Sequence, residues 1–151
     1  MNKKYGFVLI ELIIVIAIMV FLLGAVIVSY RSFEKRTELE NTARNILITL
    51  ELAQNKTLAS ENDSQYGVHF ESDKYILFKG DAYESGSPDN EINQLSNRLE
   101  IYNINLTGSG SDIIFQRING NTNQDGIIDL RLISDPEKTK SIDINSFGQI
   151  E

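Results

Sequence analysis

Three patterns of apolar and polar positions follow one another along this chain of 151 residues. From Phe7 to Val28 nearly every side chain is apolar, and Glu11 is the only charged residue in that run. At about 1.5 Å of rise per residue, a helix of this length is long enough to cross a hydrocarbon core of about 30 Å. A charged side chain within such a span costs at least about 2.5 kcal/mol, so the position of Glu11 predicts a function for its carboxylate.

The second pattern is a helical period in a more polar background. Apolar residues recur at steps of three and four positions, while charged residues take the other faces. The apolar positions are Leu39, Ala43, Ile46, Leu47, Leu50 and Ala53. The period continues to about Ala59 and stops in the polar stretch Ser60–Ser64, and no proline occurs before Pro88. Together the first two patterns predict one helix of roughly 50 residues, about 80 Å long.

After Asn62 the period changes to the alternation that is typical of β-strands. Short segments rich in β-branched and aromatic residues are separated by turn residues, as in antiparallel meanders. The predicted strands are Tyr66–Phe70, Lys74–Lys79, Leu99–Leu106, Asp112–Ile118, Ile127–Ile133 and Ser141–Ile144, with Phe147–Ile150 closing the chain. The segment Asp81–Asn97 is rich in Gly, Ser, Asp and Asn and predicts a long exposed loop. The predicted fold class is α+β, with an antiparallel sheet packed on the amphipathic half of the helix.

The N-terminus resembles that of type IV prepilins and type II secretion pseudopilins. The residues that carry the resemblance are the basic leader Met1–Gly6, the Gly6-Phe7 junction, and Glu11 in the apolar run; Val8 stands where the family most often has Thr. The resemblance implies that a prepilin peptidase cuts between Gly6 and Phe7 and that the new amino group of Phe7 is methylated. It assigns Glu11 to assembly, as the partner of the Phe7 ammonium of a neighbouring subunit. Such a pair would neutralise two charges that are each costly in an apolar environment.

The same resemblance implies a pilin-like organisation of the whole chain. Its segments would be a leader at 1–6, a transmembrane or filament-core half of the helix at 7–30, an amphipathic half at 31–61, and a β-rich globular domain at 62–151. The chain would be a single-pass protein of the cytoplasmic membrane with its C-terminal domain on the outer side, and would later join a pilus or pseudopilus. Its implied partners are the prepilin peptidase, other pilin or pseudopilin subunits, the inner-membrane assembly platform and membrane lipid. Lysines and arginines flank both ends of the run, so the processing motif rather than charge bias sets this orientation.

A second resemblance covers the strand-rich half. The segments Ile114–Arg117, Ile127–Leu132 and Ser141–Ile150, with Leu52-Ala53-Gln54 near the helix end, are similar to the corresponding parts of H-type (GspH/FimT) minor pseudopilins. This implies a subunit present in few copies rather than the main filament protein. The shared N-terminus leaves open whether the machine is a pilus, a secretion apparatus or a competence filament.

Other interpretations of the apolar run explain fewer residues. A secretory signal peptide has an apolar core of roughly 7–15 residues and a small-residue cleavage site, and neither fits here. A plain anchor explains neither Glu11 nor the Gly6-Phe7 junction. A membrane-tethered binding module and a DNA-uptake pilin remain the alternative functions. The formal charge of −7, two units more negative without the leader lysines, disfavours contact with nucleic acid.

Candidate chemistry outside the helix is limited to one loop. Asn121, Asn123, Asp125 and Asp129 carry side-chain oxygens at the spacing of an EF-hand-type calcium loop, with Gly126 at the sixth position. The twelfth position is Leu132 where a bidentate Glu is expected, so a polar hairpin turn with Asp125-Gly126 at its tip is favoured over calcium.

No feature of the sequence argues for an enzyme. The chain has no cysteine and a single histidine, His69, which excludes Cys–His pairs and multi-histidine metal sites. The alternation around His69 predicts a surface or edge position for it. No cofactor is expected, and the absence of cysteine means that the exported domain would lack a disulfide.

Overall fold

The computed structural model describes the backbone of residues 9–151, and the side chains of that range except 24–32. Residue contacts divide the chain into two compact units, Met1–Arg36 and Thr37–Glu151, which are described separately. The second unit is called the head below. The leader, the Gly6-Phe7 junction and its implied cleavage site lie outside the described residues.

Helix α1 has backbone bounds of Leu9–Leu58. Its side chains are described in two stretches, residues 9–23 and 33–58. The helix ends because the chain turns into left-handed backbone, with positive φ at Ser60, Asn62 and Asp63. Short polar side chains tolerate this conformation better than branched apolar ones, which explains why the polar stretch after Ala59 stops the helix as predicted.

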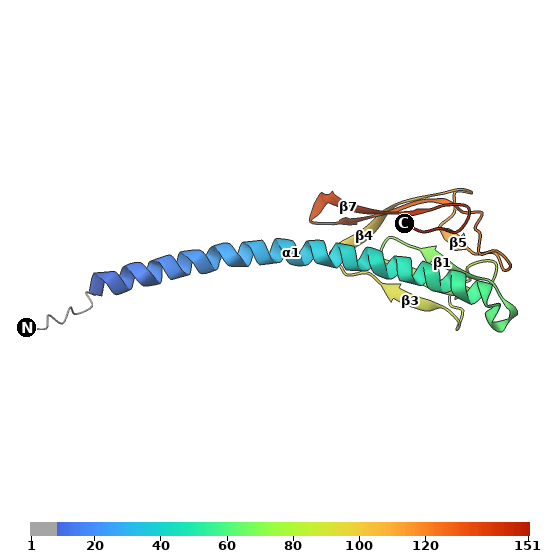
Figure 1. The fold of residues 1–151 in the computed structure, drawn as a ribbon, viewed down its shortest axis with the longest axis horizontal. Helices are drawn as coiled ribbons and strands as arrows, with labels where there is room; N and C mark the ends of the chain where they lie inside the picture. The colour runs from blue at the N-terminus through green and yellow to red at the C-terminus, as the bar shows by residue number, and fades with distance from the viewer. Residues whose placement is uncertain (1–8) are drawn as a thin grey trace, which may run out of the picture. The chain divides into compact units, whose positions relative to one another are not determined.

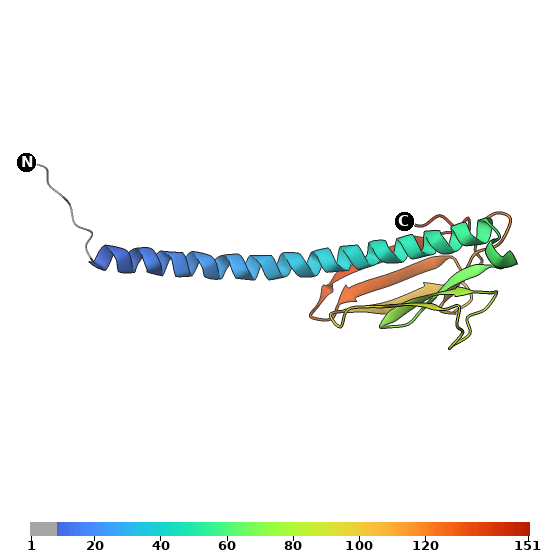
Figure 2. The same cartoon turned by 90° about the horizontal axis from the view of Figure 1, so that it is seen from below.

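The strands of the head form two antiparallel sheets (Figures 1 and 2). The first sheet has the order β3-β2-β1-β5, with bounds β3 Glu91–Gln94, β2 Lys74–Lys79, β1 Tyr66–Phe70 and β5 Asp112–Ile114. The second has the order β4-β6-β7, with bounds β4 Leu99–Leu106, β6 Gly126–Leu132 and β7 Asp135–Ile144. A short 3₁₀ turn, η1, covers Glu61–Asp63 between the helix and β1.

One core joins the helix to both sheets. The predicted apolar stripe of α1 is buried at five positions and partly buried at Leu47. It contacts inward-facing residues of the first sheet and of the second, for example Val68 and Ile128, which are both fully buried. Burial of these side chains, at about 25 cal/mol per Å² of apolar surface, is the main stabilising term of the head.

The face of the first sheet that points away from the core, called its second face below, is also covered. Ile76 and Phe78 point away from the core yet are only 1% exposed. The phenyl ring of Phe78 lies over Gly67, where any Cβ would approach it to 2.6 Å. Tyr83, from the loop after β2, contacts Phe78 edge-on at 5.7 Å between ring centroids. The loop after β2 therefore packs against this face of the sheet and does not extend freely into solvent.

The predicted fold needs correction. The prediction was a long N-terminal helix with a membrane-spanning first half, packed on a single antiparallel sheet. The described apolar stretch of α1 covers 15 residues, whereas crossing a bilayer takes about 20. The strands divide between two sheets because β4 pairs with β6, which is distant in sequence, and not with β3 just before it.

Within the described residues, no helical stretch combines the length and the apolar character needed to span a membrane. That finding contradicts the predicted localisation as a single-pass protein of the cytoplasmic membrane.

Three strand predictions also differ from the structure. The segment Asp81–Asn97 contains strand β3, an edge strand of polar composition that alternation did not reveal. Strand β5 ends at Ile114, short of the predicted Ile118, because the chain turns at Gln116. Strand β7 starts at Asp135 and not at Ser141, and it includes a proline because one side of this edge strand needs no backbone donor.

Candidate functional site

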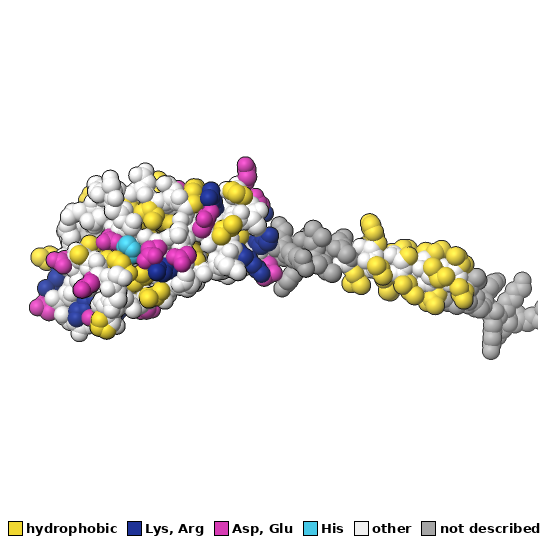
Figure 3. Space-filling view, turned by 180° about the vertical axis from the view of Figure 1, so that it is seen from behind, with side chains coloured by type: hydrophobic (Ala, Val, Ile, Leu, Met, Phe, Trp, Pro, Cys, Tyr) yellow, Lys and Arg dark blue, Asp and Glu magenta, His cyan; other side chains and the backbone are white. Residues whose placement is uncertain are grey.

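The largest exposed apolar surface among the described residues belongs to the first stretch of α1. Every large hydrophobic side chain from residue 9 to 23 is at least 40% exposed, and Phe21 reaches 78%. They are Leu9, Ile10, Leu12, Ile13, Ile14, Val15, Ile16, Ile18, Met19, Val20, Phe21, Leu22 and Leu23. Figure 3 shows these side chains in yellow on the stretch of helix described there. Successive helical positions are about 100° apart, so this surface surrounds the helix on all sides.

Glu11 is exposed and lies in the first turn of α1 as described. Its predicted partner, the amino group of Phe7, lies outside the described residues, as does Gly6. Contiguous exposed apolar surface of this kind is typical of surfaces that contact another protein, a membrane or a ligand.

The loop predicted as a calcium site or hairpin turn has another arrangement. Asp129 lies within β6, where its carboxylate accepts hydrogen bonds from Asn103 at 2.8 Å and Ser141 at 2.5 Å on the two flanking strands. Asn123 accepts one from the Gln116 side chain at 3.0 Å. The structure therefore places these two candidate ligands in separate networks. In the described part of the chain, no group of three or more His, Cys, Asp or Glu side chains is placed to hold a metal ion.

The hairpin turn predicted at Asp125-Gly126 also lies elsewhere in the chain. Gly126 is the first residue of β6 and pairs with Leu106 on one side and Ile144 on the other, so Asp125-Gly126 is not a hairpin tip. The reversal occurs at Gln116–Asn121, where the backbone N–H of Gln116 donates to the carbonyl of Asn121 at 2.8 Å. Gly126 has a different role: a Cβ there would lie 2.0 Å from the carbonyl oxygen of Asn105, so only glycine fits the close approach of β4.

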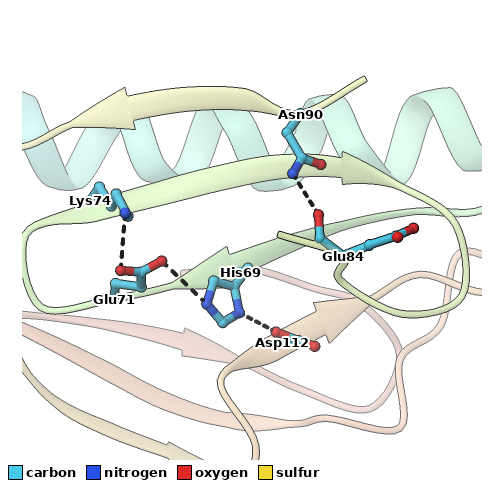
Figure 4. A network of polar contacts seen from close by, with 6 residues as sticks. All are labelled: His69, Glu71, Lys74, Glu84, Asn90 and Asp112. Carbon is cyan, nitrogen blue, oxygen red and sulfur yellow. Dashed lines mark hydrogen bonds and ion pairs between the residues drawn. The ribbon is translucent and has the colours of Figure 1, made fainter. Parts of the chain in front are cut away.

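His69 lies in a polar network on the second face of the first sheet (Figure 4). Its Nδ1 is 2.5 Å from a carboxylate oxygen of Asp112, its partner across the β1–β5 pair. Its Nε2 is 3.7 Å from Glu71, whose other oxygen is 3.1 Å from Lys74 Nζ. The hydrogen bond to Glu71 raises the pKa of Lys74 above its ordinary value. The imidazole also stacks on Tyr83, with centroids 3.9 Å apart and planes 6° from parallel.

His69 faces away from the buried Val68 and Phe70, as the alternation predicts, but it lies neither on an edge strand nor in a fully exposed position. The side chain of His69 is 18% exposed, and β1 lies between β2 and β5. In Figure 3 the histidine, in cyan, is flanked by acidic side chains. Asp112 is 43 positions away, so only the strand pairing brings the two together. The network fixes the short edge strand β5 and the loop after β2 to the centre of the sheet.

The same close-up shows how that loop is held. The side-chain amide of Asn90 donates to the carbonyl oxygen of Glu84 at 2.8 Å and closes the loop between β2 and β3 (Figure 4). This bond and the ring contacts of Tyr83 keep the cover of the sheet in one arrangement.

The side chain of Gln54 links the helix to two turns that contain glycine. The side-chain Nε2 of Gln54 donates to the carbonyl oxygens of Gly120 and Gly148, both at 2.9 Å. Both glycines are buried and have positive φ, 70° and 74°. Gln54 appeared in the sequence only as part of the helix-end resemblance, because its two acceptors are 66 and 94 positions away.

No protein-family model, curated protein or solved structure matches this chain. The resemblance to prepilins and to H-type pseudopilins, and the partners that it implies, therefore stay predictions.

Proposed function

We propose that this protein is a non-enzymatic subunit of a pilin-type filament, which assembles through the N-terminal part of α1. The observation that carries the proposal is the apolar surface of residues 9–23, which is exposed on every side of the helix. A single flat partner would cover only one side of such a helix. Several like helices packed around it would cover all sides, and parallel copies of one chain supply them.

Glu11 gives this assembly its register. In a bundle of apolar helices an unpaired carboxylate would be costly, so each Glu11 requires a cation from a neighbour. Cleavage after Gly6 would create that cation as the amino group of Phe7. The pair can form only between copies that are shifted along the helix axis, which sets the spacing of subunits.

The first test is co-purification of two differently tagged full-length copies expressed in the same cells. Changing Glu11 to Ala in both copies should reduce recovery of the second tag at least about tenfold, since it leaves the amine of Phe7 unpaired among apolar side chains. Glu51 is exposed on the same helix, within the head, and supplies the matched control. Equal recovery for Glu11→Ala and Glu51→Ala would refute the assembly role of Glu11.

The second test is mass spectrometry of the N-terminus of the protein from producing cells. A methylated Phe7 supports the proposed processing, and an intact Met1 contradicts it. Replacing Gly6 with a bulky residue should leave the uncut precursor, visible as a slightly larger band.

A further inference from the structure

The end of the head at which α1 stops carries two loops that are hydrogen-bonded to the helix and to each other. One is the turn Gln116–Asn121, and the other is Asn145–Gln149 after β7. Gln54 donates one hydrogen bond to each loop, and the backbone N–H of Thr122 donates to the carbonyl of Ser146 at 3.2 Å. A Cβ on Gly148 would lie 2.2 Å from the carbonyl oxygen of Gly120, so the loops are in direct contact.

These loops present large apolar side chains to solvent. Ile118 is fully exposed, at 100%, and Phe147 is 70% exposed. We call these two residues the apolar tip. The charged neighbour of Ile118 is already neutralised, because the guanidinium of Arg117 binds both the carbonyl, at 3.1 Å, and the carboxylate of Asp63. Apolar groups on a preorganised backbone, without unpaired charge beside them, are typical of a protein contact rather than of a solvated loop.

The other end of the head contains a pocket of about 450 Å³. Its apolar wall is formed by Leu95, Leu99 and Ile133, and Ile133 is 52% exposed. Its polar wall includes Asp73 and Gln94, which are hydrogen-bonded to each other at 3.0 Å. The pocket is open to solvent, and its volume leaves room for the side chains of the apolar tip. We call this the base pocket.

The apolar tip and the base pocket lie at opposite ends of the head. The pocket adjoins α1 near Glu38, because Arg98 contacts Glu38 at 3.4 Å and accepts a backbone bond from Ile133 at 2.9 Å. The tip is held by Gln54, 16 positions later, which is about 24 Å along the helix. Figures 1 and 2 show the β6–β7 turn at one end of the head and the loop before β6 at the other.

We propose that the apolar tip of one copy inserts into the base pocket of a second copy, so that heads stack head to tail. A contact between two different surfaces of the same chain generates a row of copies, unless its rotation closes the row into a ring. Burial of Phe147 and Ile118 would supply the apolar centre of the contact, and the amides and hydroxyls of the pocket its polar rim. The inference rests on the proposed role as a self-assembling subunit. It makes the chain a repeating subunit, in contrast to the few-copy role implied by the H-type resemblance.

The test is a cross-link in the full-length chain, which contains no native cysteine. A variant with Ile118→Cys and Ile133→Cys is assembled in cells and treated with a short bis-maleimide. Stacked heads should give a ladder of dimers, trimers and higher multimers, because each copy offers both ends. Either cysteine alone should give no ladder, since two tips or two pockets do not meet.

A second change in the ladder variant tests the contact itself. Phe147→Asp should lower the yield of multimers at least about tenfold, because it would bury an unpaired charge at the contact. Ile92→Asp is the matched control: Ile92 is 62% exposed on β3, outside both surfaces, and the change should leave the ladder intact.

Four results would overturn the stacking of heads. They are the absence of a ladder, a ladder insensitive to Phe147→Asp, dimers only, and cross-links to a protein of another mass. Loss of the ladder with unchanged co-purification of tagged copies would remove this contact and leave the proposed function standing. A ladder together with equal co-purification of the Glu11→Ala and Glu51→Ala variants would leave the stacking of heads standing and remove the proposed role of Glu11 in assembly.

Discussion

The side chain of Gln54 offers the sharpest test of how the head is held together. Its amide donates two hydrogen bonds of 2.9 Å to partly buried carbonyls, those of Gly120 and Gly148. Replacing Gln54 with Leu keeps the length of the side chain approximately, but removes both donors. The change thus isolates the hydrogen bonds from the packing of the helix on the two loops.

The expected loss in the free energy of unfolding depends on whether the two carbonyls find other hydrogen-bond partners. A typical hydrogen bond contributes about 0.5–1.5 kcal/mol net, and a buried group left without a partner costs about 1–3 kcal/mol. Two carbonyls at the rim of the head can recover part of this from water. We therefore expect the free energy of unfolding to fall by about 2–4 kcal/mol for Gln54→Leu.

The measurement is urea unfolding of the full-length chain, followed by the near-ultraviolet circular dichroism of the tyrosines of the head. With an m-value of about 2 kcal/mol per M, the midpoint should fall by about 1–2 M. Asn55→Leu is the control, since Asn55 is the next residue of the helix and is exposed. A midpoint for Gln54→Leu equal to that of Asn55→Leu would refute the view that Gln54 holds the loops.

Two further predictions concern the head. Gly148→Ala should lower the free energy of unfolding by about 2 kcal/mol or more, because it adds both the strain of positive φ and a 2.2 Å approach to Gly120. Gly86→Ala is the control, because φ is also positive there but the space around it is open. That change should cost about 1 kcal/mol in the same urea titration. Burial raises the pKa of Tyr75 above its ordinary value of 10.0. The folded state therefore keeps this proton at a higher pH than the unfolded state, and stability falls as the pH rises above about 10. Tyr75→Phe should lose less stability than wild type between pH 9 and 11, and an unchanged alkaline loss would contradict this origin.

The sequence alone determined those parts of the fold that depend on residues close together in the chain. The bounds of β2 and β4 match the predicted segments Lys74–Lys79 and Leu99–Leu106, because alternation and turn residues both mark them. The apolar period of α1 predicted which of its positions would be buried in the head. The sequence alone also singled out Glu11 in its apolar run, since a lone charge there is visible without any structure.

The tertiary structure decided everything that depends on distant partners. Alternation did not detect β3 because an exposed edge strand needs no apolar face, and it did not show that the strands divide into two sheets. The side chain of His69 is largely covered because Asp112 on β5 and the ring of Tyr83 lie against it. Gln54 links the helix to the loops only because two glycine turns meet at its amide. A sequence pattern records the environment of each residue along the chain, whereas pairing and close approach are set by how segments far apart in the chain come together.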